Sequence, residues 1–278
     1  MPLPVVAVVL LAAFLHAAWN AVAHAIADRL IGFALIGAAA TAGGAVLTLV
    51  VGAPAPASWP YLAVSAALHV GYSLLLLRSY ELGEFGQAYP LARGTSPWLV
   101  AIGAAAFAHE TLTPPRLAGV AVISVGLASL VFAGRLTRAD VPAIGAALLT
   151  GVTIAAYTTV DGLGVRHAGG ALGYAAWLFI AEGAVIPLMA VAARREKFWA
   201  HACPHLAAGL AGGVASIIAY GLVLWAQTRG ALAPIAALRE TSVIIGAIIG
   251  ALVFRERFGR WRIVATVLVA GGVALINV

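Results

Sequence analysis

Charged residues are scarce in this sequence. Asp, Glu, Lys and Arg make up 9% of the chain, whereas they make up roughly a quarter of an ordinary soluble domain. The alternation of apolar and polar residues that marks transmembrane β-strands is also absent. Hydrophobic residues make up 63% of the chain, mean hydropathy is +1.03, and apolar runs of roughly 18 residues or more recur along it. These features exclude a soluble domain and predict an all-α polytopic membrane protein.

Cysteine occurs once, at Cys203, which excludes a disulfide within the chain and a cluster of thiolate ligands around a metal ion. No phosphate-binding loop or metal-ligand spacing is found, so we expect neither ATP-driven transport nor a bound metal ion. The net charge of +6 does not indicate nucleic acid as a partner, because the basic residues lie in short connections between apolar runs. We therefore expect membrane lipid around the chain and a small molecule as its substrate.

Ten apolar runs account for the length of the chain, and each is long enough to cross a membrane as a helix. No basic region precedes the first run, so we expect a membrane span there and not a cleaved signal peptide. The connections are short and hold no soluble domain. The predicted spans are residues 4–27, 31–52, 60–80, 85–108, 116–133, 141–161, 171–192, 205–227, 231–254 and 260–277.

The basic residues of the connections are distributed unequally between the two sides of the membrane. Three lie on one side, namely Arg116, Arg166 and Arg229. Ten lie on the other side, which is therefore predicted to be cytoplasmic, with both termini outside. These ten are Arg29, Arg135, Arg138, Arg194, Arg195, Lys197, Arg255, Arg257, Arg260 and Arg262. The expected location is the inner membrane, with multiple passes.

A short motif occurs twice, as Arg93-Gly94-Thr95-Ser96 and, 146 positions later, as Arg239-Glu240-Thr241-Ser242. Self-similarity at a fixed offset indicates an internal duplication, with halves at 1–135 and 136–278. Each half holds an odd number of spans, five, so the halves must be inverted relative to each other. Both arginines then reach the middle of the membrane, where inverted-repeat transporters bind their substrates.

Polar side chains follow one face of several spans. His16, Asn20 and His24 are spaced four residues apart on the first span, with Trp19 beside them. The sixth span carries a matching stripe, and the third span adds more polar positions. Because polar side chains are costly in lipid, we expect these faces to line a cavity or another helix. The further positions are Thr150, Thr153, Tyr157 and Asp161 on the sixth span and Ser65, His69, Tyr72 and Ser73 on the third.

Several stretches of this arrangement resemble the EamA branch of the drug/metabolite transporter superfamily, over the whole chain. The stretches that carry the resemblance are His16-Ala-Ala-Trp19-Asn20, Tyr89-Pro90-Leu-Ala-Arg93-Gly-Thr-Ser96-Pro97, Val160-Asp161-Gly-Leu-Gly-Val-Arg166 and Leu238-Arg239-Glu240-Thr241-Ser242-Val243. His109-Glu110 and Arg255-Glu256-Arg257 keep part of the family's Gly-Glu-Arg signature. The resemblance implies ten transmembrane helices as two inverted five-helix repeats, a central cavity, and secondary transport without a cofactor. A weaker resemblance, to a subgroup associated with phosphonate-utilisation loci, gives a hint of the substrate.

Arg93 and Arg239 allow two interpretations. They bind an anionic substrate group or trade ion pairs during gating, or else they form permanent ion pairs with Glu182 and Glu240, because buried charges are usually paired. Adjacent residues on a helix point about 100° apart, so we expect Arg239 and Glu240 not to satisfy each other. Glu182, central in the seventh span, is the first candidate for proton coupling, and Glu240 is the second.

The remaining candidates surround these charges. Five aromatic residues are expected either to form a wall of the cavity or to pack singly, namely Trp19, Tyr89, Tyr157, Tyr220 and Trp225. His16, Asn20, Ser96 and Ser242 are expected to add polar contacts to substrate. Pro90 and Pro97 flank Arg93 and predict either an interrupted helix or a tolerated kink. Asp161 lies near a predicted span end, where it either ends the helix or binds.

Taken together, the residues predict a secondary transporter that moves a small polar metabolite, anionic or zwitterionic, by alternating access with proton coupling. The alternative is an intramembrane enzyme or a subunit of a lipid-head-group flippase. An enzyme needs a nucleophile and a base within hydrogen-bond reach, and no such constellation is found. We therefore predict that the chain is not an enzyme and that it works as a monomer or homodimer.

Overall fold

The structure is a computed structural model that describes residues 1–82, 85–130, 141–253 and 259–277. Every regular element within these ranges is a helix. The α-helices are α1 (Leu3–Ala25), α2 (Arg29–Val51), α3 (Trp59–Leu82), α4 (Phe85–Phe107), α5 (Pro114–Ala128), α6 (Val141–Arg166), α7 (Ala171–Gly183), α8 (Val185–Arg194), α9 (Phe198–Ala202), α10 (Leu206–Gln227), α11 (Leu232–Arg239), α12 (Thr241–Val253) and α13 (Arg260–Ile276). Short 3-10 turns cover Pro56–Ser58, Arg195–Lys197 and Cys203–His205.

The predicted all-α membrane fold is confirmed. Within the described ranges, six stretches of helix are long and apolar enough to cross a membrane. The fifth stretch is 57 residues long and includes α7 to α10. The six are Leu3–Ala23, Arg29–Val51, Pro56–Arg78, Val141–Arg166, Ala171–Gln227 and Leu232–Ile249. The count of ten crossings and the inverted repeat stay predictions.

Two of the predicted spans are each divided between two helices. The span predicted at 171–192 is divided at Ala184 into α7 and α8, and the span predicted at 231–254 is divided at Glu240 into α11 and α12. At the second break the Thr241 hydroxyl donates to the carbonyl of Leu238 at 2.8 Å, which satisfies a carbonyl of the last turn of α11. The motif of the second half therefore lies at a helix break.

The first copy of the motif lies in an unbroken helix. α4 runs from Phe85 to Phe107 through Pro90 and Pro97, so the two prolines do not interrupt it. Pro97 lacks the N–H that would bond the carbonyl of Arg93, and the Ser96 hydroxyl donates to this carbonyl at 3.4 Å. A neighbouring hydroxyl thus partly replaces the missing backbone donor, and of the two expectations for these prolines the interruption is wrong.

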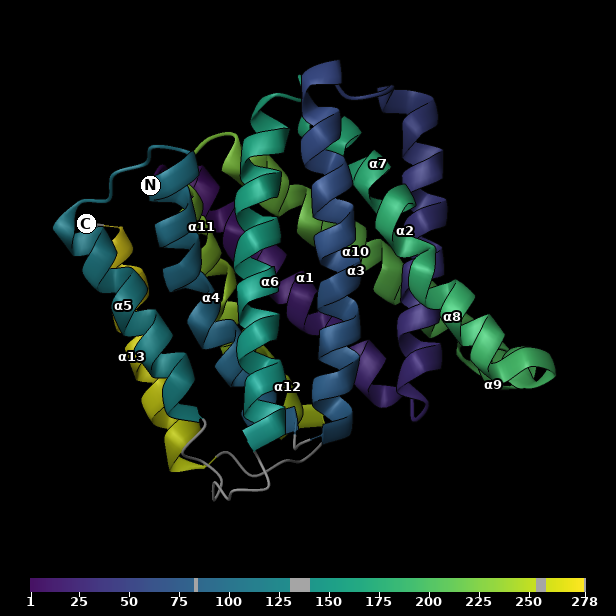
Figure 1. Ribbon diagram of the computed structural model, residues 1–278. Coiled ribbons are helices and arrows are strands. Elements are labelled where there is room, and N and C mark those ends of the chain that lie inside the picture. Colours follow the sequence, from purple (N-terminus) through teal and green to yellow (C-terminus); the bar gives the residue numbers. More distant parts are fainter. Residues whose placement is uncertain (83–84, 131–140, 254–258, 278) are drawn as a thin grey trace.

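Helix contacts recur between the two halves: where two helices pack together, the corresponding helices of the opposite halves also pack together. α1 lies along α10, and α6, the corresponding first helix of the second half, lies along α3 (Figure 1). Likewise α4 packs on α6, and α12 packs on α1. α2 packs on α7 and α5 packs on α13, so in these two pairs each helix contacts its own counterpart in the other half. This pattern is the one that a two-fold relation between the halves would produce.

α5 and α13 come close because both carry glycine at their contact. A Cβ atom on Gly119 would lie 2.7 Å from the carbonyl oxygen of Gly272, and a Cβ on Gly272 would lie 2.7 Å from that of Gly119. Neither position has space for a side chain. Small residues at helix contacts are typical of membrane proteins, where close backbone approach replaces the hydrophobic effect as the basis of packing.

An ion pair joins the two halves of the chain at each end of the helical bundle. At one end, Arg166 Nη2 lies 2.7 Å from Glu110 Oε1, and Glu110 Oε2 accepts a 2.8 Å hydrogen bond from the N–H of Leu232 at the start of α11. At the other end, Arg194 Nε lies 2.8 Å from Asp28 Oδ2. The hydrogen bond from Arg194 lowers the pKa of the Asp28 carboxyl. The halves are thus connected at both ends of the helical bundle.

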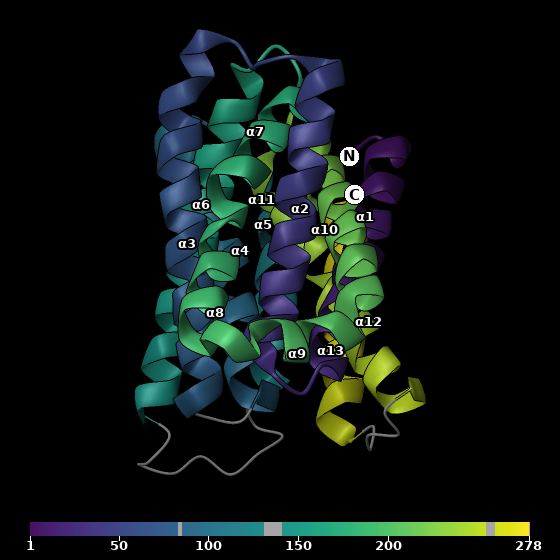
Figure 2. The same ribbon diagram turned by 90° about the vertical axis from the view of Figure 1, so that its right-hand side faces the viewer.

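The two termini of the chain lie at the same end of the bundle. Figures 1 and 2 both place the start of α1 beside the end of α13. The start of α2, the end of α8 and the start of α13 lie at the opposite end (Figure 1), so Arg29, Arg194 and Arg260 share that end. Four further basic residues of this group lie outside the described residues, namely Arg135, Arg138, Arg255 and Arg257.

Candidate functional site

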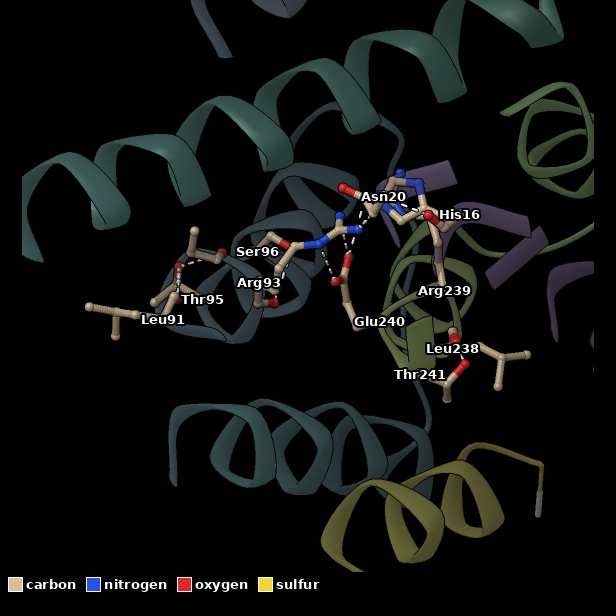
Figure 3. A network of polar contacts seen from close by, with 11 residues as sticks. His16, Asn20, Leu91, Arg93, Thr95, Ser96, Leu238, Arg239, Glu240 and Thr241 are labelled. Carbon is tan, nitrogen blue, oxygen red and sulfur yellow. Dashed lines mark hydrogen bonds and ion pairs between the residues drawn. The ribbon is translucent and has the colours of Figure 1, made fainter. Parts of the chain in front are cut away.

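The two copies of the motif meet through three charged side chains (Figure 3). Glu240, at the break between α11 and α12, lies between two guanidinium groups. Its Oε2 is 3.1 Å from Arg93 Nε, and its Oε1 is 3.3 Å from Arg239 Nη2. The side chains of Arg93 and Glu240 are 1% and 0% exposed, so water does not screen this contact. Residues 147 positions apart in the chain thus form one buried ionic triad.

The contact between Arg239 and Glu240 corrects the sequence-based expectation that neighbours in a helix point too far apart to pair. The expectation assumed one continuous helix. α11 ends at Arg239, and the backbone at Glu240 has φ −68° and ψ −10° before α12 begins. With the break at this point, the long arginine side chain reaches the carboxylate of the next residue. Glu240 therefore pairs with both arginines.

His16 extends the triad, and Asn20 does not. His16 Nε2 is in hydrogen-bond contact with Arg93 Nη2, so α1 reaches the guanidinium group on α4. Asn20 donates from Nδ2 to the carbonyl of His16 at 2.7 Å, which is a contact within its own helix. The side chain of His24 lies outside the described residues. Of the polar stripe on α1, His16 is thus the member that contacts the charged centre.

The serines of the two motifs differ in their surroundings. Ser96 is buried and donates to the carbonyl of Arg93 in its own helix. Ser242 is also buried, and its hydroxyl has no hydrogen-bond partner among the residues that the structure describes. The side chain of Tyr89 lies outside the described part of the chain. A contact of any of the three with substrate stays a prediction.

A cavity of about 140 Å³ lies beside the triad. This volume is roughly ten times what one water molecule needs by the same measure. Four of the predicted site residues line the cavity together with Glu182, and they come from α1, α6 and α11. These four are His16, Trp19, Tyr157 and Arg239. Arg239 therefore connects the cavity to the buried triad, while Arg93 and Glu240 lie outside the described lining.

Glu182 lies in the last turn of α7, and its carboxyl group contacts the His69 ring on α3. Its Oε2 is 3.4 Å from His69 Nδ1, and 16% of the Glu182 side chain is exposed. No ion pair with an arginine is found for Glu182 among the described residues, so the expected pairing of Glu182 with Arg93 or Arg239 is wrong. His69 Nδ1 also lies 3.1 Å from the Ser65 hydroxyl. Glu182 therefore faces the cavity with histidine as its neighbour.

Aromatic rings form much of the cavity wall. The ring of Tyr157 stacks on His69 with centroids 3.9 Å apart, and the Tyr220 ring lies 5.4 Å from the same histidine. The ring centroids of Phe179 and Tyr220 are 6.3 Å apart, and those of Trp19 and His16 are 5.1 Å apart. Tyr157, Tyr220, Phe179, Trp19 and His69 all line the cavity. Such a wall excludes water and favours a ligand with flat or cationic groups.

Asp161 is a functional candidate whose surroundings the sequence did not predict. It was placed at a span end, but it is 0% exposed inside α6. Its Oδ1 accepts a 2.9 Å hydrogen bond from the Tyr174 hydroxyl, and its Oδ2 accepts one from the Tyr220 hydroxyl. Tyr174 and Tyr220 come from α7 and α10, so no local spacing in the sequence signals this contact.

The described residues contain no group of three or more histidine, cysteine, aspartate or glutamate side chains with the geometry of a metal site. Cys203, the residue that an enzyme would need as a thiol nucleophile, is exposed in the connection before α10. The chemistry of the cavity is therefore that of ion pairs, hydroxyl groups and aromatic rings.

Comparison with known proteins agrees with this arrangement. The model of the EamA-like transporter family matches residues 141–278 of this chain. A solved crystal structure is similar over 98% of this chain and 94% of its own, with a TM-score of 0.73 and 18% sequence identity. At this identity the likeness shows the fold alone. No curated protein matches the chain significantly.

This match confirms the resemblance to the EamA-like transporters of the drug/metabolite transporter superfamily. The chain is accordingly a multi-pass membrane protein, and the family indicates a membrane transporter of the drug/metabolite type. Members of this family are transporters and not enzymes, which favours transport over the alternative of an intramembrane enzyme or flippase subunit.

Proposed function

We propose that this protein is a secondary transporter of the inner membrane, and that it moves a small polar metabolite with an acidic group by alternating access. The substrate is an organic anion or zwitterion. Ten crossings in two inverted five-helix repeats would place its site at the middle of the membrane. The exchange of packing partners between the halves, α1 with α10 and α6 with α3, supports this architecture.

The proposal rests on the surroundings of Arg239. Glu240 supplies one negative charge to two guanidinium groups, so the triad retains one positive charge. Arg239 lines the cavity, and its Nε has no hydrogen-bond partner among the described residues. A buried donor without a partner is costly, and a carboxylate or phosphonate oxygen would satisfy it. The cavity therefore favours an acidic substrate group at Arg239.

Glu182 is the better of the two candidates for proton coupling. Glu240 is fully buried between two guanidinium groups, and removal of its charge would leave both arginines without a counter-ion. Glu182 faces the cavity and contacts His69, so a proton can reach it without breaking the triad. We propose that Glu182 takes up and releases a proton during the transport cycle, and that Glu240 remains ionised. Replacing Glu182 with glutamine should then abolish uptake driven by a pH gradient in proteoliposomes.

Binding and thermal stability measured together on Arg239 variants test the proposal. Arg239→Lys keeps the charge but loses the bidentate fork, so affinity for an acidic substrate should drop by about 1–3 kcal/mol. Arg239→Ala should cost more. The ligand is found first by a thermal-shift screen of amino acids, phosphonates and organic anions on the purified protein.

Arg229→Lys is the matched control, because Arg229 lies over the ring of Trp225, outside the cavity lining. Lost binding with retained stability in the Arg239 variants supports the substrate site. Parallel losses of binding and stability would instead show that Arg239 is a structural ion-pair partner, and the proposed role would be abandoned.

A further inference from the structure

The connection between α8 and α10 differs from the corresponding connection of the first half. In the first half, residues 52–58 join α2 to α3 and contain no charged side chain. In the second half, residues 195–205 carry Arg195, Glu196 and Lys197 and form the short helix α9. A duplication of the chain does not by itself account for this difference. The charged connection is therefore a feature of one end of the bundle only.

α9 lies across the end of the bundle instead of continuing the line of α8 (Figure 2). The chain turns at Arg195, whose φ of 48° is uncommon for a residue other than glycine. Backbone of this kind persists where the surrounding structure holds it. After the turn, Phe198 and Ala202 are buried in one apolar cluster with Ile31 and Leu35 of α2. One face of the connection is thus fixed to the bundle, and the other face is exposed.

The exposed face combines two basic side chains with an aromatic one. Arg195 and Lys197 are exposed and form no ion pair with any residue that the structure describes. Arg194, by contrast, is paired with Asp28. Trp199 follows and is 63% exposed. Tryptophan is enriched at the boundary between lipid tails and water, because its ring is apolar and its N–H is polar. This order of side chains matches a lipid molecule, with its phosphate group above its acyl chains.

Apolar side chains continue the same surface along α8. Leu188, Met189 and Val191 are exposed there, and lipid tails cover such side chains in a membrane. Glu196 is exposed as well, so the charges of this residue and its two basic neighbours sum to one positive charge. A positive charge attracts anionic lipid more than zwitterionic lipid. A free anion would gain nothing from the exposed apolar side chains, so the surface favours a lipid.

We propose that the connection between α8 and α10 binds an anionic phospholipid, with Arg195 and Lys197 at the phosphate group and Trp199 beside the upper part of the acyl chains. The bound lipid holds α9 against α2. Phe33 of α2 and Ile186 of α8 belong to the apolar cluster beneath α9 and also line the central cavity. The lipid therefore stabilises the part of the bundle that carries this wall of the cavity, whatever the cavity transports.

The single cysteine of the chain gives a direct readout of this surface. Cys203 is exposed in the same connection, so a fluorophore that responds to its surroundings can be attached there without changing any other residue. Labelled protein in detergent is titrated with phosphatidylglycerol, with phosphatidylcholine and, at constant ionic strength, with inorganic phosphate. Phosphatidylglycerol should change the fluorescence at a concentration on the order of tenfold lower than phosphatidylcholine does. Inorganic phosphate should neither change the fluorescence nor displace the lipid.

Substitutions at neighbouring positions test the two kinds of contact separately. Arg195→Gln and Lys197→Gln should each weaken the binding of phosphatidylglycerol by about fivefold, and Glu196→Gln should strengthen it. Trp199→Ala should weaken the binding of both lipids and keep the preference for phosphatidylglycerol. Arg229→Gln is the matched control, because it removes an exposed basic side chain at the other end of the bundle, next to Gly230, and it should bind lipid as the wild type does.

Thermal unfolding of the same samples gives a second measurement. Phosphatidylglycerol should raise the unfolding temperature of the wild type more than that of the double variant Arg195→Gln/Lys197→Gln. Equal binding of the two lipids, or a double variant that keeps the preference or the stabilisation, would overturn the proposal. Loss of the preference in Arg229→Gln would show an effect of total charge instead of a site. Displacement of the lipid by inorganic phosphate would show a site for free anions, and the proposed lipid site would be abandoned.

Discussion

At the scale of single residues, the buried triad shows how two arginines persist inside an apolar bundle. A guanidinium group in hydrocarbon is costly, about 2.5–3.5 kcal/mol on the milder scale, and a single carboxylate offsets much of this for both groups. Glu240 contacts Arg93 at 3.1 Å and Arg239 at 3.3 Å, with no exposed surface. One residue therefore determines the electrostatics of both motif copies.

The glutamate at the centre of the triad should be essential for stability. Glu240→Gln leaves two buried guanidinium groups without a counter-ion, and breaking a buried pair costs about 3–5 kcal/mol. We expect a large loss of thermal stability in detergent, measured by the unfolding temperature of the purified variant. Glu196→Gln, an exposed site, serves as the control and should leave the temperature unchanged. A Glu240→Gln variant as stable as the control would show that the arginines have another counter-ion.

At the scale of elements, close approach between helices depends on positions without a side chain. α4 and α6 meet at Gly151, where a Cβ atom would lie 2.2 Å from Thr95 Oγ1 and 2.8 Å from the carbonyl oxygen of Ala92. Both neighbours lie within two residues of Arg93. The packing of α6 on α4 therefore supports the position of the first motif arginine.

Two glycine-to-alanine substitutions on α6 distinguish the effect of this contact on stability from the effect of helix propensity. Gly151→Ala introduces an atom where the backbone of α4 leaves no space, and overpacking of this kind costs about 1–3 kcal/mol. Gly145→Ala, on the same helix, has nothing within 4 Å of the new Cβ and should be neutral or slightly stabilising. Thermal unfolding of the two variants compares them directly. Equal stability would mean that α4 and α6 shift apart without cost.

At the scale of the whole molecule, the two ends of the bundle differ in charge. Arg29, Arg194 and Arg260 lie at one end, while the start of α1 and the end of α13 lie at the other (Figure 1). The ion pairs Asp28 with Arg194 and Glu110 with Arg166 join the halves at these two ends. The positive-inside rule predicts that the arginine-rich end lies in the cytoplasm.

Reporter fusions check this orientation. Alkaline phosphatase fused after Val278 should be active, because the C-terminus is predicted to lie outside the cytoplasm, whereas a fluorescent protein fused there should stay dark. The same reporters inserted after Lys197, in the connection between α8 and α10, should give the opposite result. A fluorescent C-terminal fusion would contradict the charge argument or the count of crossings.

The sequence by itself determined the class of protein, the positions of the helices and the two motif arginines. Composition and apolar runs suffice for these, because a membrane helix satisfies its own backbone and needs only length and hydrophobicity. The self-similarity of the motif also placed Arg93 and Arg239 in equivalent positions. The sequence also singled out Glu182 and Glu240, of which Glu240 is buried and Glu182 is partly exposed.

Only the tertiary structure decided which charges pair. Arg239 contacts Glu240 because the helix breaks between them, and Glu182 contacts His69 because α7 packs beside α3. Asp161 meets hydroxyl groups from α7 and α10, which lie 13 and 59 residues away in the chain. Helix breaks and contacts between distant helices depend on packing, and packing in an apolar bundle depends on shape rather than on local sequence pattern. For this reason the ion pairs of the triad and the contact of Glu182 with His69 could not be predicted from the chain alone.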